Sequence, residues 1–216
     1  MPETVGLDSR AKPEWRVDFA SARQYALGRL QNELSPALTY HSLRHTRDEV
    51  YPAAERLSGM EGVFGEALLL LRTAALYHDV GFTRQRKDHE LVSIQVAYEV
   101  LPAWGYQPEQ LAVIRGMIMA TRLIEPPQTL LEEIIVDADL DVLGRADFLP
   151  RNRDLRQESE AYGLAFSDEY WYSQQLGFLN WHRYRTASAR RLREAQKQEN
   201  IVLMQALLAQ ARASAR

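Results

Sequence analysis

The chain has 216 residues, of which 46% are hydrophobic and 25% charged, the balance of a globular protein with one large domain or a domain with appendages. It contains no cysteine, so disulfide staples, thiolate metal sites and cysteine nucleophiles are excluded. The net charge is near −3, with basic and acidic residues interspersed. Nucleic acid is therefore not expected as the main partner.

Two segments bear on where the protein resides. Residues 1–14 are polar, contain two prolines and lack a basic region followed by an apolar core, so they predict a lead-in segment and no signal peptide. The most apolar run, residues 67–80, includes Arg72, His78 and Asp79 and is too short and too polar to span a bilayer. We expect a cytoplasmic protein without a membrane partner.

The predicted elements in the first half of the chain are helical. Helical periodicity over residues 17–34 ends at Pro36, and a second helix is predicted over residues 37–57, with a kink or restart at Pro52. After a glycine-rich loop, the apolar run predicts a buried helix over residues 66–80, with Gly81 as its C-terminal stop.

The second half continues this pattern after a basic loop at residues 82–88. Further helices are predicted over three segments and then, in a more polar pattern, over residues 155–216; the three segments are 89–101, 108–121 and 129–143. No segment alternates with a period of two residues, and β-branched residues are sparse. The sequence therefore predicts an all-α fold, a single helical domain over residues 15–216.

Histidines and aspartates carry the chemical signal. His41 and His45 lie four residues apart, so they share a face if both are on a helix. His78-Asp79 ends the apolar run, where partial burial and the negative end of the helix dipole both disfavour an ionised carboxylate unless a cation offsets them. The alternative for His78-Asp79 is a helix-ending pair hydrogen-bonded to nearby backbone.

Three aspartates alternate at residues 137, 139 and 141. The spacing resembles the start of a calcium loop, but Val142 and Phe148 occupy the glycine and glutamate positions, which excludes an EF-hand. On one continuous helix Asp139 would point away from the other two, so one face is expected to be solvated. The His41–His45 pair lacks the glutamate of zinc proteases, since Ser42 stands in its place.

Taken in chain order, these histidines and aspartates resemble the signature of the HD-domain superfamily of metal-dependent phosphohydrolases. That signature is His … His-Asp … Asp on an all-helical core. Here the signature reads His45, His78-Asp79 and Asp139. Residues 40–48 also resemble the opening motif of cyclic-nucleotide phosphodiesterases. The resemblance covers residues 37–145, and residues 155–205 are similar to the C-terminal region of stand-alone bacterial HD proteins.

The resemblance implies a helical bundle with additional C-terminal helices, and one divalent metal ion (Mn, Fe, Mg, Zn or Ni) held by His45, His78, Asp79 and Asp139. It implies that His41 is a general acid and that Asp79 or Asp139 orients the attacking water. The extra histidines of two-metal members are lacking, which leaves His89 as a second-site or phosphate contact. The glycine-tyrosine-proline motif of cyclic-di-nucleotide hydrolases is absent.

The implied activity is hydrolysis of a small-molecule phosphate ester, in particular a nucleotide; a homo-oligomer is possible. Arg84, Arg86 and Lys87 could close over the site and bind phosphate, or form an ordinary solvated loop. Arg122 is a further candidate for substrate binding, and Arg145 a weaker one. Two rival functions stay open, a metal- or nucleotide-binding signalling module and a metal-dependent oxygenase on the same scaffold.

Overall fold

The computed structural model describes residues 17–214, and within that range it contains helices and no strand. The predicted all-α fold is confirmed. The predicted lead-in at residues 1–14 lies outside the described residues. None of the helices in this range is both long enough and apolar enough to cross a bilayer.

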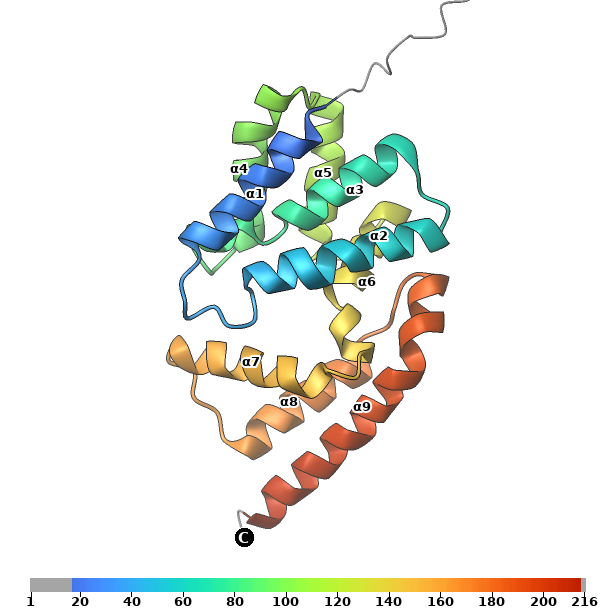
Figure 1. The fold of residues 1–216 in the computed structure, drawn as a ribbon. Coiled ribbons are helices and arrows are strands. Elements are labelled where there is room, and N and C mark those ends of the chain that lie inside the picture. The colour runs from blue at the N-terminus through green and yellow to red at the C-terminus, as the bar shows by residue number, and fades with distance from the viewer. Residues whose placement is uncertain (1–16, 215–216) are drawn as a thin grey trace, which may run out of the picture.

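Six α-helices form a bundle in which α3, the predicted apolar helix, is central (Figure 1). Leu71, Ala74 and Ala75 of α3 are fully buried, because the helix is apolar on almost every side and is covered by neighbours all round. The six helices are α1 (Phe19–Glu33), α2 (Tyr51–Met60), α3 (Gly65–Tyr77), α4 (His89–Val100), α5 (Pro108–Ala120) and α6 (Leu130–Asp139).

Three more helices, α7 (Phe148–Ala161), α8 (Asp168–Trp181) and α9 (Ala187–Ser214), lie against one end of this bundle (Figure 1). They have a second, smaller hydrophobic core that includes Leu143, Phe148 and Met204. Ion pairs and hydrogen bonds tie the two parts together, so the C-terminal helices have a fixed place beside the bundle.

Two aspartates provide that tie. Asp137 is fully buried and accepts hydrogen bonds from the backbone N–H groups of Arg185 and Thr186, at 2.8 and 2.7 Å. Asp141 pairs with Arg193 of α9 at 2.7 Å. The predicted helix over residues 129–143 is wrong at its end, since α6 stops at Asp139 and a 3₁₀ turn (η4, Asp141–Gly144) follows. The expected solvated face is also wrong, because Asp137 and Asp141 are buried and only 19% of the Asp139 side chain is exposed.

The end of α3 differs from the prediction as well. α3 stops at Tyr77, and Gly81 lies in a 3₁₀ turn (η2, Val80–Thr83) that follows. A Cβ on Gly81 would lie 1.9 Å from the backbone oxygen of His89. Glycine is therefore needed here for the close approach of α4, not for a left-handed helix stop, and this approach brings His89 next to Asp79.

The predicted helix over residues 37–57 starts late. Helical structure begins at Leu43, continues as a π-helix (η1, His45–Val50) and becomes α2 at Tyr51, so the restart predicted at Pro52 is confirmed. Proline has no N–H to donate, which favours a change of hydrogen-bond pattern at this point. His41 lies before the helix, so the expectation that it shares a helical face with His45 is wrong.

Candidate metal centre and the adjoining cavity

Four side chains from three separate parts of the chain converge at the end of the bundle. His45 Nε2 lies 3.0 Å from Asp139 Oδ1 and 3.8 Å from Asp79 Oδ2. His78 Nε2 lies 3.4 Å from the same Asp139 oxygen and 3.3 Å from the same Asp79 oxygen. Ligand atoms of His45, His78 and Asp79 all lie within 4.8 Å of one another.

Both histidines are oriented by their other ring nitrogen. His78 Nδ1 lies 2.9 Å from the backbone oxygen of Ala75, and His45 Nδ1 lies 3.3 Å from Glu49 Oε2. An oxygen acceptor requires an N–H donor, so each Nδ1 carries the proton. With a cation in the cluster, Nε2 of His45 and of His78 would then offer its lone pair as a ligand, as in metal-ligating histidines.

The cluster fits a divalent cation. His78 Nε2 and Asp79 Oδ2 are buried without a hydrogen-bond partner, which is costly unless another group satisfies them. Ligands about 2.1 Å from one ion lie roughly 3 to 4 Å apart, and the four distances from the histidine nitrogens to the carboxylate oxygens, 3.0 to 3.8 Å, fall in this range. Burial acts to lower the pKa of His78, but Asp79 and Asp139 outweigh it and raise that pKa well above its ordinary value. The site thus favours positive charge, and its imidazole and carboxylate groups suit Mn, Fe, Zn or Ni.

Glu49 supports this cluster and was missed by the sequence analysis. Its carboxylate is buried, hydrogen-bonds His45 and pairs with Arg151 at 3.0 Å and with Arg145 at 3.5 Å. Burial acts to raise the pKa of Glu49, but the His45 hydrogen bond and the charge of Arg151 lower it to about 2. The signal that could have found Glu49 is its position four residues after His45.

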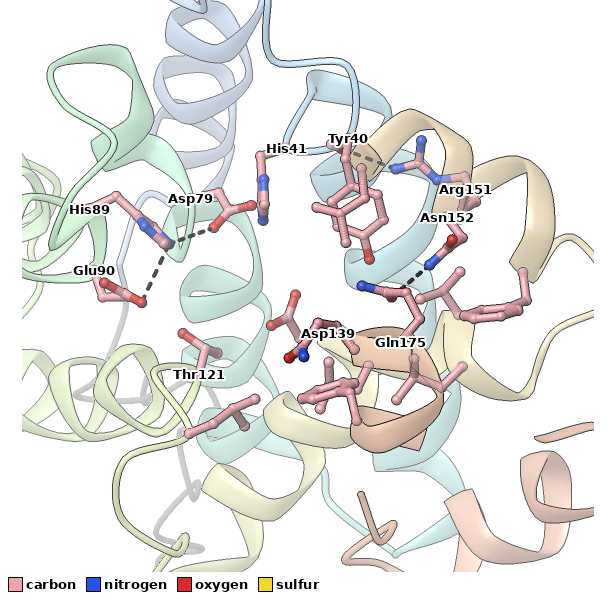
Figure 2. Close-up of a pocket in the computed structure, with 18 residues that line it drawn as sticks. Tyr40, His41, Asp79, His89, Glu90, Thr121, Asp139, Arg151, Asn152 and Gln175 are labelled. Atoms are coloured by element: carbon pink, nitrogen blue, oxygen red, sulfur yellow. Dashed lines mark hydrogen bonds and ion pairs between the residues drawn. The ribbon is translucent and has the colours of Figure 1, made fainter. Parts of the chain in front are cut away.

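His41 is held beside the cluster by a second missed residue, Glu158 of α7. Glu158 is fully buried and accepts hydrogen bonds from the backbone N–H groups of Tyr40 and His41, both at 2.9 Å. Its other oxygen lies 2.5 Å from His41 Nδ1. The His41 ring stacks on Phe82, and its Nε2 side is directed into the cavity (Figure 2). Glu158 lies 117 residues from His41, so no local pattern could have revealed the pair.

The other predicted substrate-binding residues differ in their placement. His89 lines the cavity, with Nε2 at 3.4 Å from Asp79 Oδ1. Four basic residues lie outside the cavity lining: Arg84, which pairs with Glu99; Arg86, which lies over the ring of Tyr162; Arg122, which pairs with Asp88; and Lys87. Arg145, beside Asp147, also lies outside it. The structure therefore brings His89, but not the basic loop, to the cluster.

A cavity of about 430 Å³ extends from the cluster to helices α7 and α8 (Figure 2). The bundle end contributes charged and polar groups, including His41, Asp79 and Asp139, whereas α7 contributes Arg151 and Asn152 and α8 contributes Gln174 and Gln175. Apolar residues form much of the wall between them: Leu140, Val142, Leu143, Phe148, Leu155 and Phe178. The volume is that of a small-molecule site.

Comparison with known proteins supports the fold. No protein-family model and no curated protein matches the chain. A predicted HD superfamily hydrolase from an uncultured Thermotogales bacterium superposes with a TM-score of 0.60 at 20% identity, over 88% of this chain and 91% of that one. Bacillus subtilis YpgQ, solved in complex with ADP, superposes with a TM-score of 0.62 at 20% identity, over 88% and 92%.

A protein from Lactobacillus plantarum, solved as a structural genomics target, gives a TM-score of 0.64 at 18% identity, over 91% of this chain and 95% of that one. At such identities the comparison shows the fold. The chain thus shares its helical fold with these three proteins, one of which is a predicted HD superfamily hydrolase, as the sequence resemblance implies.

Proposed function

We propose that this protein is a metal-dependent phosphohydrolase or phosphodiesterase of the HD type that acts on a phosphate ester in a nucleotide. The observation that carries the proposal is the convergence of His45, His78, Asp79 and Asp139 beside His41, at one end of a cavity that His41, Asp79 and Asp139 line. The likeness to an HD superfamily hydrolase supports the reaction class, and the ADP bound to YpgQ supports a nucleotide.

One divalent ion, held by those four side chains, would act as a Lewis acid and lower the pKa of a water molecule. Asp79 or Asp139 orients the attacking water through a hydrogen bond; Asp139 is the more open of the two, with 19% of its side chain exposed against 5%. His41, held by Glu158 through Nδ1, donates a proton from Nε2 to the leaving oxygen.

Phosphate contacts complete the proposal. His89 is placed to contact a phosphate, since it lines the cavity next to Asp79. Arg84, Arg86 and Lys87 of the basic loop and Arg122 after α5 lie outside the cavity lining, so they reach the substrate only if these segments move. We propose that these basic residues contribute to substrate binding and take no part in the chemical step.

The test combines metal binding with a substrate screen. The metal-free protein is loaded separately with Mn²⁺, Fe²⁺, Zn²⁺, Ni²⁺ and Mg²⁺, and the hydrolysis products of nucleoside mono-, di- and triphosphates and of cyclic nucleotides are separated and quantified by chromatography. We expect turnover with at least one ion and none in Asp139→Asn. Metal binding without turnover on any of these substrates would contradict hydrolysis and favour a binding module.

A further inference from the structure

The far end of the cavity, at α7 and α8, is suited to a neutral group. Arg151 is the one cationic arginine or lysine among the described residues that line the cavity. Its guanidinium is fully engaged, because it pairs with Glu49 and Asp154 and donates to the backbone oxygen of Tyr40. No free positive charge faces this end, so the phosphates belong at the metal and histidine end.

Hydrogen bonds in this region have a fixed direction. Trp171 Nε1 donates to Asn152 Oδ1 over 2.9 Å, and an indole N–H can only donate. Asn152 therefore has its oxygen toward Trp171 and its amino group toward Gln175, where Nδ2 donates to Oε1 over 2.6 Å. Both Trp171 and Asn152 are buried, so the hydrogen bonds from Trp171 through Asn152 to Gln175 are held in place.

These hydrogen bonds fix the orientation of the Gln175 amide. Because its Oε1 accepts from Asn152, its amino group is the free end of the amide, and this nitrogen points into the cavity (Figure 2). The hydroxyl of Tyr40 extends into the same space. The Tyr40 ring is fixed by Arg151, whose guanidinium carbon lies 4.5 Å from the ring centre. The neutral end of the cavity thus presents a directed N–H donor beside a phenol.

We propose that this end binds the nucleobase of the substrate, and that Gln175 donates to an oxo group on the base edge. Bases with an oxo group at this edge, such as hypoxanthine and uracil, are bound in preference to adenine and cytosine, which carry an amino group there. The inference rests on the proposed function for the position of the phosphates. An amino group opposite Gln175 leaves two donors facing each other without an acceptor, which costs roughly 10- to 100-fold in affinity.

The test uses binding, so that it does not depend on turnover. Dissociation constants of inosine and adenosine monophosphate, and of uridine and cytidine monophosphate, are measured calorimetrically on the Mn²⁺-loaded full chain. We expect the oxo member of each pair to bind about 10- to 100-fold tighter. Equal affinities within both pairs would overturn the inference.

Gln175→Glu provides the decisive variant. A glutamate keeps the shape of the side chain and the acceptor for Asn152, but presents an oxygen to the cavity, so the preference should reverse or vanish. Gln174→Glu is the matched control, because it adds the same charge at the neighbouring exposed position and should weaken all four nucleotides without changing the ratios. An unchanged ratio in a folded Gln175→Glu protein would overturn the role of Gln175.

Two outcomes separate this inference from the proposed function. If the oxo preference is found but no nucleotide is hydrolysed, the base site stands and the enzymatic proposal fails. If inosine and adenosine triphosphates are hydrolysed with equal kcat/KM, and p-nitrophenyl phosphate equally well, the hydrolase stands and the base site fails.

Discussion

The two ends of the cavity are built in different ways. The bundle end carries ionisable groups, namely His41, His45, His78, Asp79 and Asp139, packed so closely that buried polar atoms lack partners without a cation. The end at α7 and α8 carries amides, apolar side chains and one fully paired arginine, Arg151, and the hydrogen bonds among its amides have a fixed direction. Under the proposed function, this difference would place the reaction in the bundle and substrate selectivity in the C-terminal helices.

The largest effect is expected from breaking the bundle end. Asp79→Ala removes a proposed ligand and leaves His78 buried beside fewer anions, so bound metal and turnover should both fall to background. Metal analysis after dialysis and phosphate release check this. Asp48→Ala, an exposed aspartate paired with its neighbour Arg47, is the control and should retain both. Full metal content in Asp79→Ala would refute the role of Asp79.

Replacing His41 should separate chemistry from metal binding. His41→Ala is expected to lose about 10²- to 10⁴-fold in kcat with its metal retained, and to lose less on substrates with good leaving groups. Equal losses on good and poor leaving groups would rule out an acid role, and metal loss would make His41 a ligand or a support for one.

Glu158 links the two ends of the cavity, since it belongs to α7 but is proposed to act on the reaction by holding the proton donor His41. Glu158→Gln should lower kcat less than His41→Ala, and the double variant should be no worse than His41→Ala alone, because both changes act on one proton donor. Fully additive losses in kcat would show that Glu158 acts independently of His41.

Within the C-terminal helices, a buried histidine should govern acid stability. Burial, with smaller contributions from the charges of Lys197 and Arg185, lowers the pKa of His182 to about 3. The fold favours the neutral imidazole. Its contribution to the free energy of unfolding is therefore complete above the unfolded pKa of about 6.5 and is lost as the pH falls toward 3. Between pH 7 and 5 the wild type should lose about 2 kcal/mol more unfolding free energy than His182→Phe. Parallel denaturation curves at both pH values would contradict this.

The smallest effects are expected in the basic loop. Arg84 pairs with Glu99, and Arg86 lies over Tyr162, both outside the cavity lining. If the loop binds phosphate, Arg84→Ala and Arg86→Ala should each raise KM a few-fold, with kcat and metal content unchanged. Wild-type KM and kcat in both variants would show an ordinary solvated loop.

The sequence allowed the helical elements to be predicted, and its order of histidines and aspartates anticipated the four side chains that the structure brings together. The resemblance to the HD signature selected Asp139, because the spacing of residues 137, 139 and 141 alone left open which aspartate would face the metal. Residues that depend on long-range packing could not be found this way. Glu158 is 117 residues from His41 in the sequence. The direction of the Gln175 amide follows only from the series of hydrogen bonds that begins at Trp171 and passes through Asn152.

Helix ends were also beyond the sequence. Gly81 looked like a helix stop, but the close approach of His89 determines its position. Asp139 and Asp141 looked like members of one helix, but α6 ends at Asp139, which lets that carboxylate turn to the cluster while Asp141 turns to Arg193.

The most direct test of the metal centre is an anomalous diffraction map from crystals of the Mn²⁺-loaded protein. We expect a single strong peak about 2.0–2.3 Å from Nε2 of His45 and of His78 and from carboxylate oxygens of Asp79 and Asp139. A map without a peak at this cluster, or with the ion held by Asp137 or Asp141 instead, would contradict it.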